Sequence, residues 1–408
     1  MRTLPLRVGV NCFPLAAHLG GIRHYFINLF RVLLAAEDAP EFVFFWYPHN
    51  ASELAQLPDG RWRRGAVALQ RQEDVARHVG RMDVYFCPLS ALYPRPLPLP
   101  TVVTQPDAQE VFHPEFFTAH DLYVRDLHYA ASVRMADRVI TVSEFSKKAF
   151  VERHRVNPRR VLVAHHSVSP VFRTRESWRP PAAELPPRFV LYPANLWRHK
   201  GHEHLLQAVR WLREVRGVDV HAVFTGCRDP TAADYPLAAR ASALKVADLV
   251  HDLGFVAVEE LAYLYGRASM LVFPSLFEGF GLPLVEAMTA GCPIAALRRT
   301  AIPEVVGAAA RLYDEPTPEA LGRAIADLLA GDGLRERLID EGHARAQRFT
   351  DAAMAAVHHA AFREAARAYS RTRYEWQRWV YQPYHRTGVE ARRILRSIRP
   401  SAAAASAT

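Results

Sequence analysis

The chain has 408 residues, of which 50% are hydrophobic and 23% are charged, and its formal net charge is +9. This length favours two or three domains over one. No stretch reaches the ~18 uninterrupted apolar residues that a membrane-spanning helix needs. The four cysteines lie far apart without a C-x-x-C pair, so neither a disulfide framework nor a zinc site is indicated, and we expect a reducing cytoplasm.

Short apolar, β-branched runs alternate with longer helical patterns in the first half of the chain. The run at 6–11 precedes a loop that ends in Gly20-Gly21, followed by a helix near 22–36. Further strands are expected at 41–47, 84–88, 101–105, 138–143 and 160–167. This alternation predicts βαβ units and a parallel sheet buried on both faces.

Residues 173–188 interrupt the alternation, because the prolines at 180, 181, 186 and 187 exclude a helix or a central strand. This segment is interpreted as a linker between an acceptor-side domain, 1–172, and a second domain, 189–370. In the second domain, strands are expected at 189–195, 218–226, 249–255, 270–275 and 293–297. The predicted fold class is α/β, with two doubly wound halves, and ligands are expected at the carboxyl ends of the strands.

One stretch of the second half, PSLFEGFGLPLVEAMTAG at 274–291, combines two glutamates with a glycine-rich turn. The Gly279-Phe280-Gly281-Leu282 turn follows a predicted strand and precedes a predicted helix, so its N–H groups form a site suited to a phosphate. Glu286 can then accept hydrogen bonds from a ribose diol, and Glu278 can meet a transferred sugar. The alternative is that Glu286 only complements the helix dipole, worth ~0.3–1 kcal/mol.

The E-x7-E pattern, written here EGFGLPLVE, resembles the signature of glycosyltransferase family 4, a family of retaining GT-B enzymes. Residues 260–307 resemble the second domain of that family almost continuously. The segments GGIRHYFINLF, FHPEFF and ADRVITVSEFS resemble its bacterial mannosyltransferase-like branch, and the likeness covers most of 6–350. It implies two Rossmann-like domains facing a cleft. It also implies retaining transfer of a hexose from a nucleotide diphosphate sugar, GDP-mannose favoured, to a glycan or lipid-linked acceptor in bacterial surface polysaccharide synthesis.

The resemblance implies roles for the matching residues. Glu286 holds the nucleotide ribose, Glu278 contacts the donor sugar, and Arg198 and Lys200 supply positive charge to the diphosphate. The alternative for the two cations is that they are ordinary solvated charges before a helix. No D-x-D triplet occurs, so we predict that no metal ion is needed, because Arg198, Lys200 and the helix N-terminus can stabilise the diphosphate.

Two features of the first half bear on the same site. A tight turn explains Gly20 and Gly21 by itself, whereas the resemblance places their loop beside the donor phosphate and the acceptor. The family branch usually carries His-Asp after the strand at 101–105; here Asp107 is kept, but Pro106 replaces the histidine. This departure leaves open a non-catalytic nucleotide-sugar-binding relative. A second alternative is a nucleotide-sugar 2-epimerase on the same fold, although the E-x7-E context argues against it.

The C-terminal segment, 371–408, is basic and aromatic and is expected to cross back to the first domain, with a disordered end. Between 371 and 400, eight arginines accompany Trp376, Trp379, Tyr381 and Tyr384, against Glu375 and Glu390. One interpretation is peripheral docking of 371–400 on the anionic inner face of the cytoplasmic membrane. The other is that the two tryptophans pack on the first domain and the arginines are merely solvated. Nucleic acid is not an expected partner, because no recognised module for it appears.

Overall fold

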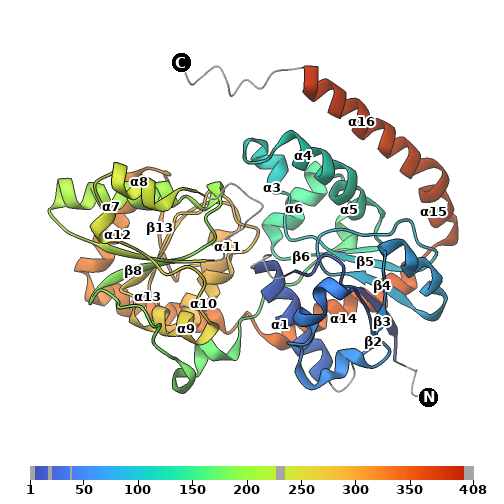
Figure 1. Cartoon of the computed structure of the whole chain (residues 1–408), viewed down its shortest axis with the longest axis horizontal. Helices are drawn as coiled ribbons and strands as arrows, with labels where there is room; N and C mark the ends of the chain where they lie inside the picture. The colour runs from blue at the N-terminus through green and yellow to red at the C-terminus, as the bar shows by residue number, and fades with distance from the viewer. Residues whose placement is uncertain (1–4, 17–20, 37–38, 227–234, 399–408) are drawn as a thin grey trace. The chain divides into compact units, whose positions relative to one another are not determined.

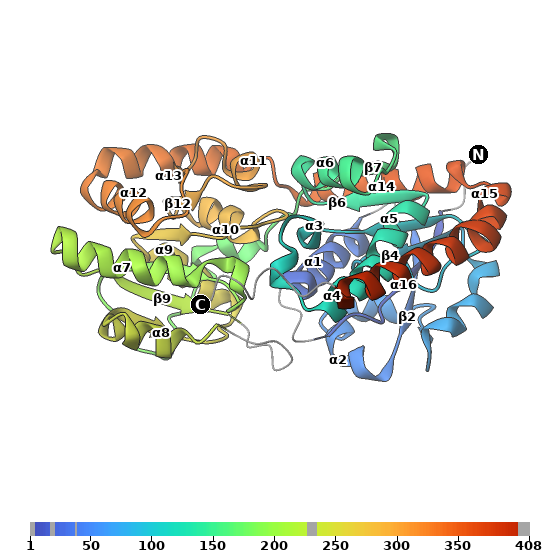
Figure 2. The same ribbon diagram turned by 90° about the horizontal axis from the view of Figure 1, so that it is seen from above.

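The computed structural model describes residues 5–16, 21–36, 39–226 and 235–398. The chain forms two compact units. The first unit comprises Met1–His165 together with Ala352–Thr408, and the second comprises His166–Asp351 (Figures 1 and 2). The chain therefore leaves the first unit once and returns to it near residue 352.

A parallel seven-stranded sheet forms the centre of the first unit, in the order β3-β2-β1-β4-β5-β6-β7. Its strands are β1 Arg7–Asn11, β2 Glu41–Trp46, β3 Val67–Ala68, β4 Val84–Cys87, β5 Thr101–Thr104, β6 Arg138–Thr141 and β7 Val161–Val163. Six of the seven lie where the apolar runs predicted them, and the two-residue β3 was missed. The inner strands β4 and β5 are buried along their whole length, as expected for a parallel sheet covered on both faces.

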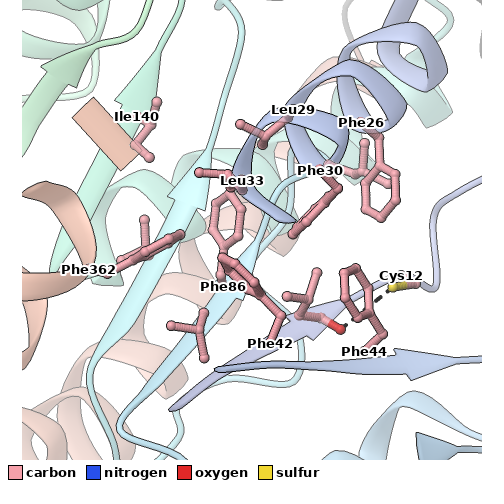
Figure 3. Close-up of a cluster of buried hydrophobic side chains, with 14 of the residues drawn as sticks. Cys12, Phe26, Leu29, Phe30, Leu33, Phe42, Phe44, Phe86, Ile140 and Phe362 are labelled. Carbon is pink, nitrogen blue, oxygen red and sulfur yellow. Dashed lines mark hydrogen bonds between the residues drawn. The ribbon is translucent and has the colours of Figure 1, made fainter. Parts of the chain in front are cut away.

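The helices of the first unit are α1 Gly21–Ala35, α2 Ala51–Leu54, α3 Gln109–Phe112, α4 Ala119–Arg125, α5 Ala131–Met135, α6 Glu144–Arg153, α14 Asp351–Ala368, α15 Arg371–Trp376 and α16 Gln382–Ile398. Helices α1 and α14 cover one face of the sheet, and α5 and α6 cover the other. Between α1, α14 and the sheet lies a cluster of phenylalanines (Figure 3). In that cluster the ring centroid of Phe362 on α14 lies 5.1 Å from Phe86 and 6.2 Å from Phe42.

These contacts place the unit boundaries differently from the sequence interpretation. The predicted second domain extended to 370, but α14 buries Phe362 in the core of the first unit, and the units divide between Asp351 and Ala352. The predicted linker, 173–188, contains no α-helix or strand, as its prolines require, yet it lies within the second unit. Its Trp178 packs so closely on α9 that a Cβ added at Gly266 would meet the indole at 2.2 Å.

The second unit contains a parallel six-stranded sheet in the order β10-β9-β8-β11-β12-β13. Its strands are β8 Phe189–Pro193, β9 His221–Thr225, β10 Val250–Asp252, β11 Met270–Phe273, β12 Ile294–Leu297 and β13 Arg311–Tyr313. Renumbered from β8, this is the order 3-2-1-4-5-6 of the doubly wound dinucleotide-binding fold. The predicted α/β class with two Rossmann-like halves is therefore confirmed, although the edge strand β13 was not predicted.

The helices of the second unit are α7 His202–Arg216, α8 Leu237–Ala243, α9 Val258–Arg267, α10 Leu282–Ala290, α11 Ile302–Val306, α12 Pro318–Ala330 and α13 Asp332–Ala346. Helices α7 and α12 pack so tightly that a Cβ added at Gly322 would lie 2.4 Å from the Trp211 ring. Within the described parts of the chain, no helix combines the length and apolar character needed to cross a bilayer.

The strand order fixes where a ligand is expected in the second unit. Strands β8 and β11 pair in the middle of the sheet, and the order reverses between them. In open α/β sheets the loops at such a switch point diverge and leave a crevice at the carboxyl ends of the strands. The two loops concerned are those that follow Pro193 and Phe273.

Candidate functional site

The loops after β8 and β11 are joined by direct backbone contacts. The loop after β8 contains a 3-10 turn, Arg198–Lys200, and ends at Gly201, whose φ is +71°. A Cβ at Gly201 would lie 2.5 Å from the carbonyl oxygen of Pro274, so only glycine allows this approach. The amide of Leu276 donates a hydrogen bond of 2.8 Å to the carbonyl of His199. These contacts hold the basic turn against the segment that carries Glu278.

Lys200 and Glu278 form an ion pair at this junction. The Lys200 Nζ lies 2.9 Å from Oε1 and 3.1 Å from Oε2 of Glu278. The two side chains are 17% and 10% exposed. An ammonium group has three donors, and Glu278 engages two acceptor positions, so one N–H remains for a phosphate oxygen. The two residues predicted for diphosphate and donor sugar are therefore brought together.

Three residues that the sequence did not single out position this pair. The Tyr192 hydroxyl donates to the carbonyl of Lys200 and lies 3.0 Å from the Ser275 Oγ. The Glu278 amide donates to Thr300 Oγ1 at 3.0 Å. Thr300 has a φ of +51°, which is unusual for a β-branched residue and costs conformational energy. Only the tertiary structure reveals these contacts, because Tyr192 and Thr300 lie far from Glu278 in sequence.

The glycine-rich turn leads directly into α10, as predicted. Gly281 adopts a φ of +91° and caps the helix, and a Cβ there would also lie 2.8 Å from the side chain of Leu284. Gly291 ends the helix with a φ of +76°. Phe280 is buried, and its ring contacts His166 edge-on at a centroid distance of 5.0 Å. The turn therefore has a defined conformation that places the N-terminal N–H groups of α10 at the carboxyl end of β11.

Glu286 lies on the buried side of α10, at 7% exposure. Its Oε2 accepts a hydrogen bond of 2.9 Å from the Tyr265 hydroxyl of α9. In the parts of the chain that the structure describes, this is the only hydrogen bond to the carboxylate. Burial raises the pKa of Glu286 to about 7, although the hydrogen bond from Tyr265 lowers it. Tyr265 is a further residue that the sequence analysis missed.

Arg198 differs from Lys200 in its surroundings. Its side chain is exposed, and no hydrogen bond or ion pair joins it to another described residue. Lys200 and Glu278 neutralise each other in a part-buried pair, so the unpaired guanidinium of the same 3-10 turn leaves the two loops with a local positive charge. This arrangement suits a multiply charged anion such as a diphosphate.

The remaining predicted site residues belong to the first unit. Asp107 follows β5, and its Oδ1 accepts a hydrogen bond of 3.0 Å from the Gln109 amide at the start of α3. Pro106 contributes its carbonyl oxygen to a hydrogen bond from Thr141 Oγ1, at 3.0 Å. Gly21 is the first residue of α1. Gly20 lies outside the described residues, and the proposed roles of Asp107, Gly20 and Gly21 stay predictions.

A metal site is not evident among the described residues, which contain no group of three or more metal-ligating side chains. The pairing of Glu278 with Lys200 also satisfies a carboxylate that would otherwise be a candidate ligand. Metal independence is not tested by this arrangement and stays a prediction.

The two Rossmann-like units have the GT-B fold of solved glycosyltransferases. HepE from Anabaena, solved with UDP-glucose, gives a TM-score of 0.67 at 18% identity, with 86% of this chain and 97% of HepE covered. Part of the sequence matches a family model. Residues 174–345 match the family model for Glycosyl transferases group 1, and they contain Arg198, Lys200, Glu278 and Glu286.

Curated relatives that resemble the chain include mannosyltransferases and D-inositol 3-phosphate glycosyltransferases. The O-antigen chain mannosyltransferase B of Escherichia coli is 26% identical over 369 residues, covering 83% of this chain and 94% of the relative. The MMP alpha-(1->4)-mannosyltransferase of Mycolicibacterium hassiacum is 34% identical over 217 residues, covering 52% of this chain and 50% of the relative. The first of these similarities extends over both units.

Proposed function

We propose that this protein is a retaining glycosyltransferase of family 4 that transfers a hexose from a nucleotide diphosphate sugar to a hydroxyl group. The observation that carries the proposal is the contact between Lys200 and Glu278 at the switch point, beside the N-terminus of α10. A cation and helix N–H groups favour a diphosphate, and a carboxylate favours sugar hydroxyls. The site thus matches both halves of such a donor.

Binding of the nucleotide is assigned to the second unit. The diphosphate meets Arg198, the remaining N–H of Lys200 and the Gly279–Leu282 turn, while Glu286 accepts a hydrogen bond from the ribose. Its Oε2 already accepts from Tyr265, so the other oxygen, Oε1, is the one available to a ribose hydroxyl. Positive charge at the diphosphate stabilises the leaving group more as the glycosidic bond breaks, which lowers the barrier to transfer.

The proposed chemistry needs no enzyme nucleophile. Both oxygens of Glu278 accept hydrogen bonds from Lys200, which fits a carboxylate that binds a sugar better than one that attacks it. We infer that the departing diphosphate helps deprotonate the incoming hydroxyl on the same face of the sugar. This same-face route gives retention of the anomeric configuration.

Mannose is the favoured hexose and GDP-mannose the favoured donor, because two of the relatives named above are mannosyltransferases. UDP-sugars are the competing donors, since HepE was solved with UDP-glucose. The proposed acceptor is a glycan or a lipid-linked glycan of bacterial surface polysaccharide, with the enzyme in the cytoplasm or peripherally on the inner face of its membrane. The E. coli relative is named for the O-antigen chain, and this supports a surface polysaccharide as the product.

The test is a set of incubations with GDP-mannose, UDP-glucose, UDP-galactose and UDP-N-acetylglucosamine, followed by NMR of the sugar products. An α-linked product formed from an α-linked donor supports retaining transfer, and a β-linked product contradicts it. Donor binding without hydrolysis or transfer identifies the non-catalytic alternative, which Pro106 motivates. Release of a 2-epimer of the donor sugar identifies the epimerase alternative.

A further inference from the structure

An unusual concentration of exposed apolar side chains lies on the C-terminal helices of the first unit. Seven large hydrophobic side chains are exposed in the described parts of the chain, and four of them fall within nine residues. These four are Trp376, Trp379, Val380 and Tyr384, with exposures of 52%, 66%, 52% and 78%. Large aromatic residues are rarely left in water in this density without a function.

The opposite side of the same helices fastens them to the first unit. Helix α15, a π-helical segment Gln377–Tyr381 and α16 follow one another without a break. Gln377 Nε2 donates to the Met135 carbonyl at 2.9 Å, and His385 Nε2 lies 2.9 Å from the Asp126 carbonyl. Figures 1 and 2 both show α16 running alongside α4 of this unit.

The buried positions recur at helical spacing, which fixes the direction of the exposed ones. Gln377, His385 and Val389 are buried, whereas Trp376, Trp379, Val380 and Tyr384 point away from the unit. The interpretation in which both tryptophans pack on the first domain is therefore wrong, since neither of them is buried. The aromatic side chains are held outward by a helix that is itself anchored.

Unpaired positive charge flanks these aromatic side chains. Arg371, Arg378 and Arg386 are exposed, and none of them forms an ion pair with a described residue. By contrast, Arg373 is paired with Asp137 and Arg392 with Asp126, at 3.1 and 3.0 Å. The arginines that anchor the helix are thus neutralised, and those on the outward side are not.

We propose that the docking face, defined as Trp376, Trp379, Val380 and Tyr384 with Arg371, Arg378 and Arg386, binds the surface of an anionic lipid bilayer. Tryptophan and tyrosine rings are favourable at the level of lipid headgroups, and arginines there attract anionic lipids. A second copy of this chain fits less well, because a symmetric contact would bring the unpaired arginines of both copies together. This inference does not depend on the nature of the reaction.

The experiment measures flotation of the full chain with vesicles, in the absence of nucleotide. The expected result is flotation with vesicles of 70% phosphatidylcholine and 30% phosphatidylglycerol, which weakens with rising salt, and little flotation with phosphatidylcholine alone. The variant Trp376→Ala/Trp379→Ala/Tyr384→Ala removes the aromatic side chains. It should lower the vesicle affinity by about tenfold or more, as expected for the loss of buried apolar area.

A matched control removes exposed apolar side chains of the second unit, through Val215→Ala/Val218→Ala/Phe255→Ala. This control should float as the unsubstituted chain does. The variant Arg371→Gln/Arg378→Gln/Arg386→Gln should lose the preference for anionic vesicles and much of the salt dependence. Circular dichroism and thermal unfolding of each variant establish that it is folded.

Two results would overturn the proposal. One is unchanged flotation of the folded aromatic variant, which would show that another surface binds lipid. The other is a concentration-dependent dimer, measured by sedimentation, that the aromatic substitutions abolish while flotation is absent throughout. Nucleotide binding should be the same in all these variants, so failure of the docking face and failure of the nucleotide site are distinguishable.

Discussion

The Lys200 ammonium donates hydrogen bonds to both carboxylate oxygens of Glu278, at 2.9 and 3.1 Å. The two residues are far apart in sequence and meet because their loops follow β8 and β11, which pair at the switch point of the sheet. Each is a candidate for a different part of the donor, so substitution of one also changes the other. Predictions for this site must therefore separate binding from turnover.

Lys200→Ala should lower turnover by about 10²–10³-fold, the range seen when a group that stabilises developing charge is removed. The affinity for the nucleoside alone should change much less, because a nucleoside has no diphosphate for Lys200 to contact, whereas the charge on the diphosphate grows as the bond breaks. Steady-state kinetics and calorimetry measure the two effects. Lys148→Ala is the matched control, since Lys148 is an exposed residue of α6. Equal losses of nucleoside binding and turnover would refute the assignment.

Glu286→Ala should weaken binding of the free nucleotide. The loss of a hydrogen bond between a carboxylate and a ribose hydroxyl is expected to cost ~1.5–3 kcal/mol, or roughly one to two orders of magnitude in Kd. Calorimetry with GDP and with UDP provides the measurement, after unfolding curves have established that the variant is folded. Unchanged affinity in a folded variant would reject the ribose contact and leave Glu286 as a helix-dipole residue.

The sequence located the turn and the helix of the candidate site in the second unit, but not the contacts between the candidate residues. The glycines of the Gly279–Leu282 segment located the turn before the helix, because glycine has strong local preferences. The pairing of Lys200 with Glu278 was not predictable from spacing, since it depends on which strands are neighbours. The same holds for Tyr265 and Glu286, which meet through the packing of α9 against α10.

The sequence also did not predict the boundary between the units near α14 or the short strands β3 and β13. Helix α14 follows the second unit in sequence, but the apolar side chain of Phe362 is buried among Phe42 and Phe86 of the first unit. No local pattern indicates which core a helix will join. Strand β3 has two residues, too few for an alternating pattern to be recognised, and the three residues of β13, Arg311–Tyr313, include no β-branched side chain.

Activity should persist when divalent ions are removed with EDTA. In the proposed function, Arg198, Lys200 and the N-terminus of α10 provide the positive charge at the diphosphate that a metal ion would otherwise provide. Assays with and without EDTA, followed by addition of Mg²⁺ or Mn²⁺, measure the dependence. A strict requirement for either ion would contradict the prediction.

Arg198→Ala should lower turnover in EDTA. Partial recovery of turnover on addition of Mg²⁺ would indicate that the Arg198 guanidinium and the metal ion act at the same place.

The stability of the folded chain should depend on pH through the ionisation of Glu286. Burial raises its pKa in the folded chain to about 7, from an ordinary value of 4.5. Between these values the folded chain binds more protons at this site than the unfolded chain, so stability falls as pH rises through the window. Above pH 7 the buried charge opposes folding by its full amount, on the order of 3 kcal/mol.

Glu286→Gln removes this pH-dependent contribution to stability, because an amide does not titrate but can still accept the hydrogen bond from Tyr265. Thermal unfolding of both proteins should give similar midpoints at pH 5 and a higher midpoint for Glu286→Gln at pH 8. His358, whose pKa burial lowers to about 4, contributes the opposite trend, but it is present in both proteins and cancels in the comparison. Tyr265→Phe provides a second check, because loss of its hydrogen bond should raise the pKa of Glu286 further and make the unfolding midpoint at pH 8 lower still. A difference between the two proteins that does not change from pH 5 to pH 8 would show that Glu286 is ionised throughout.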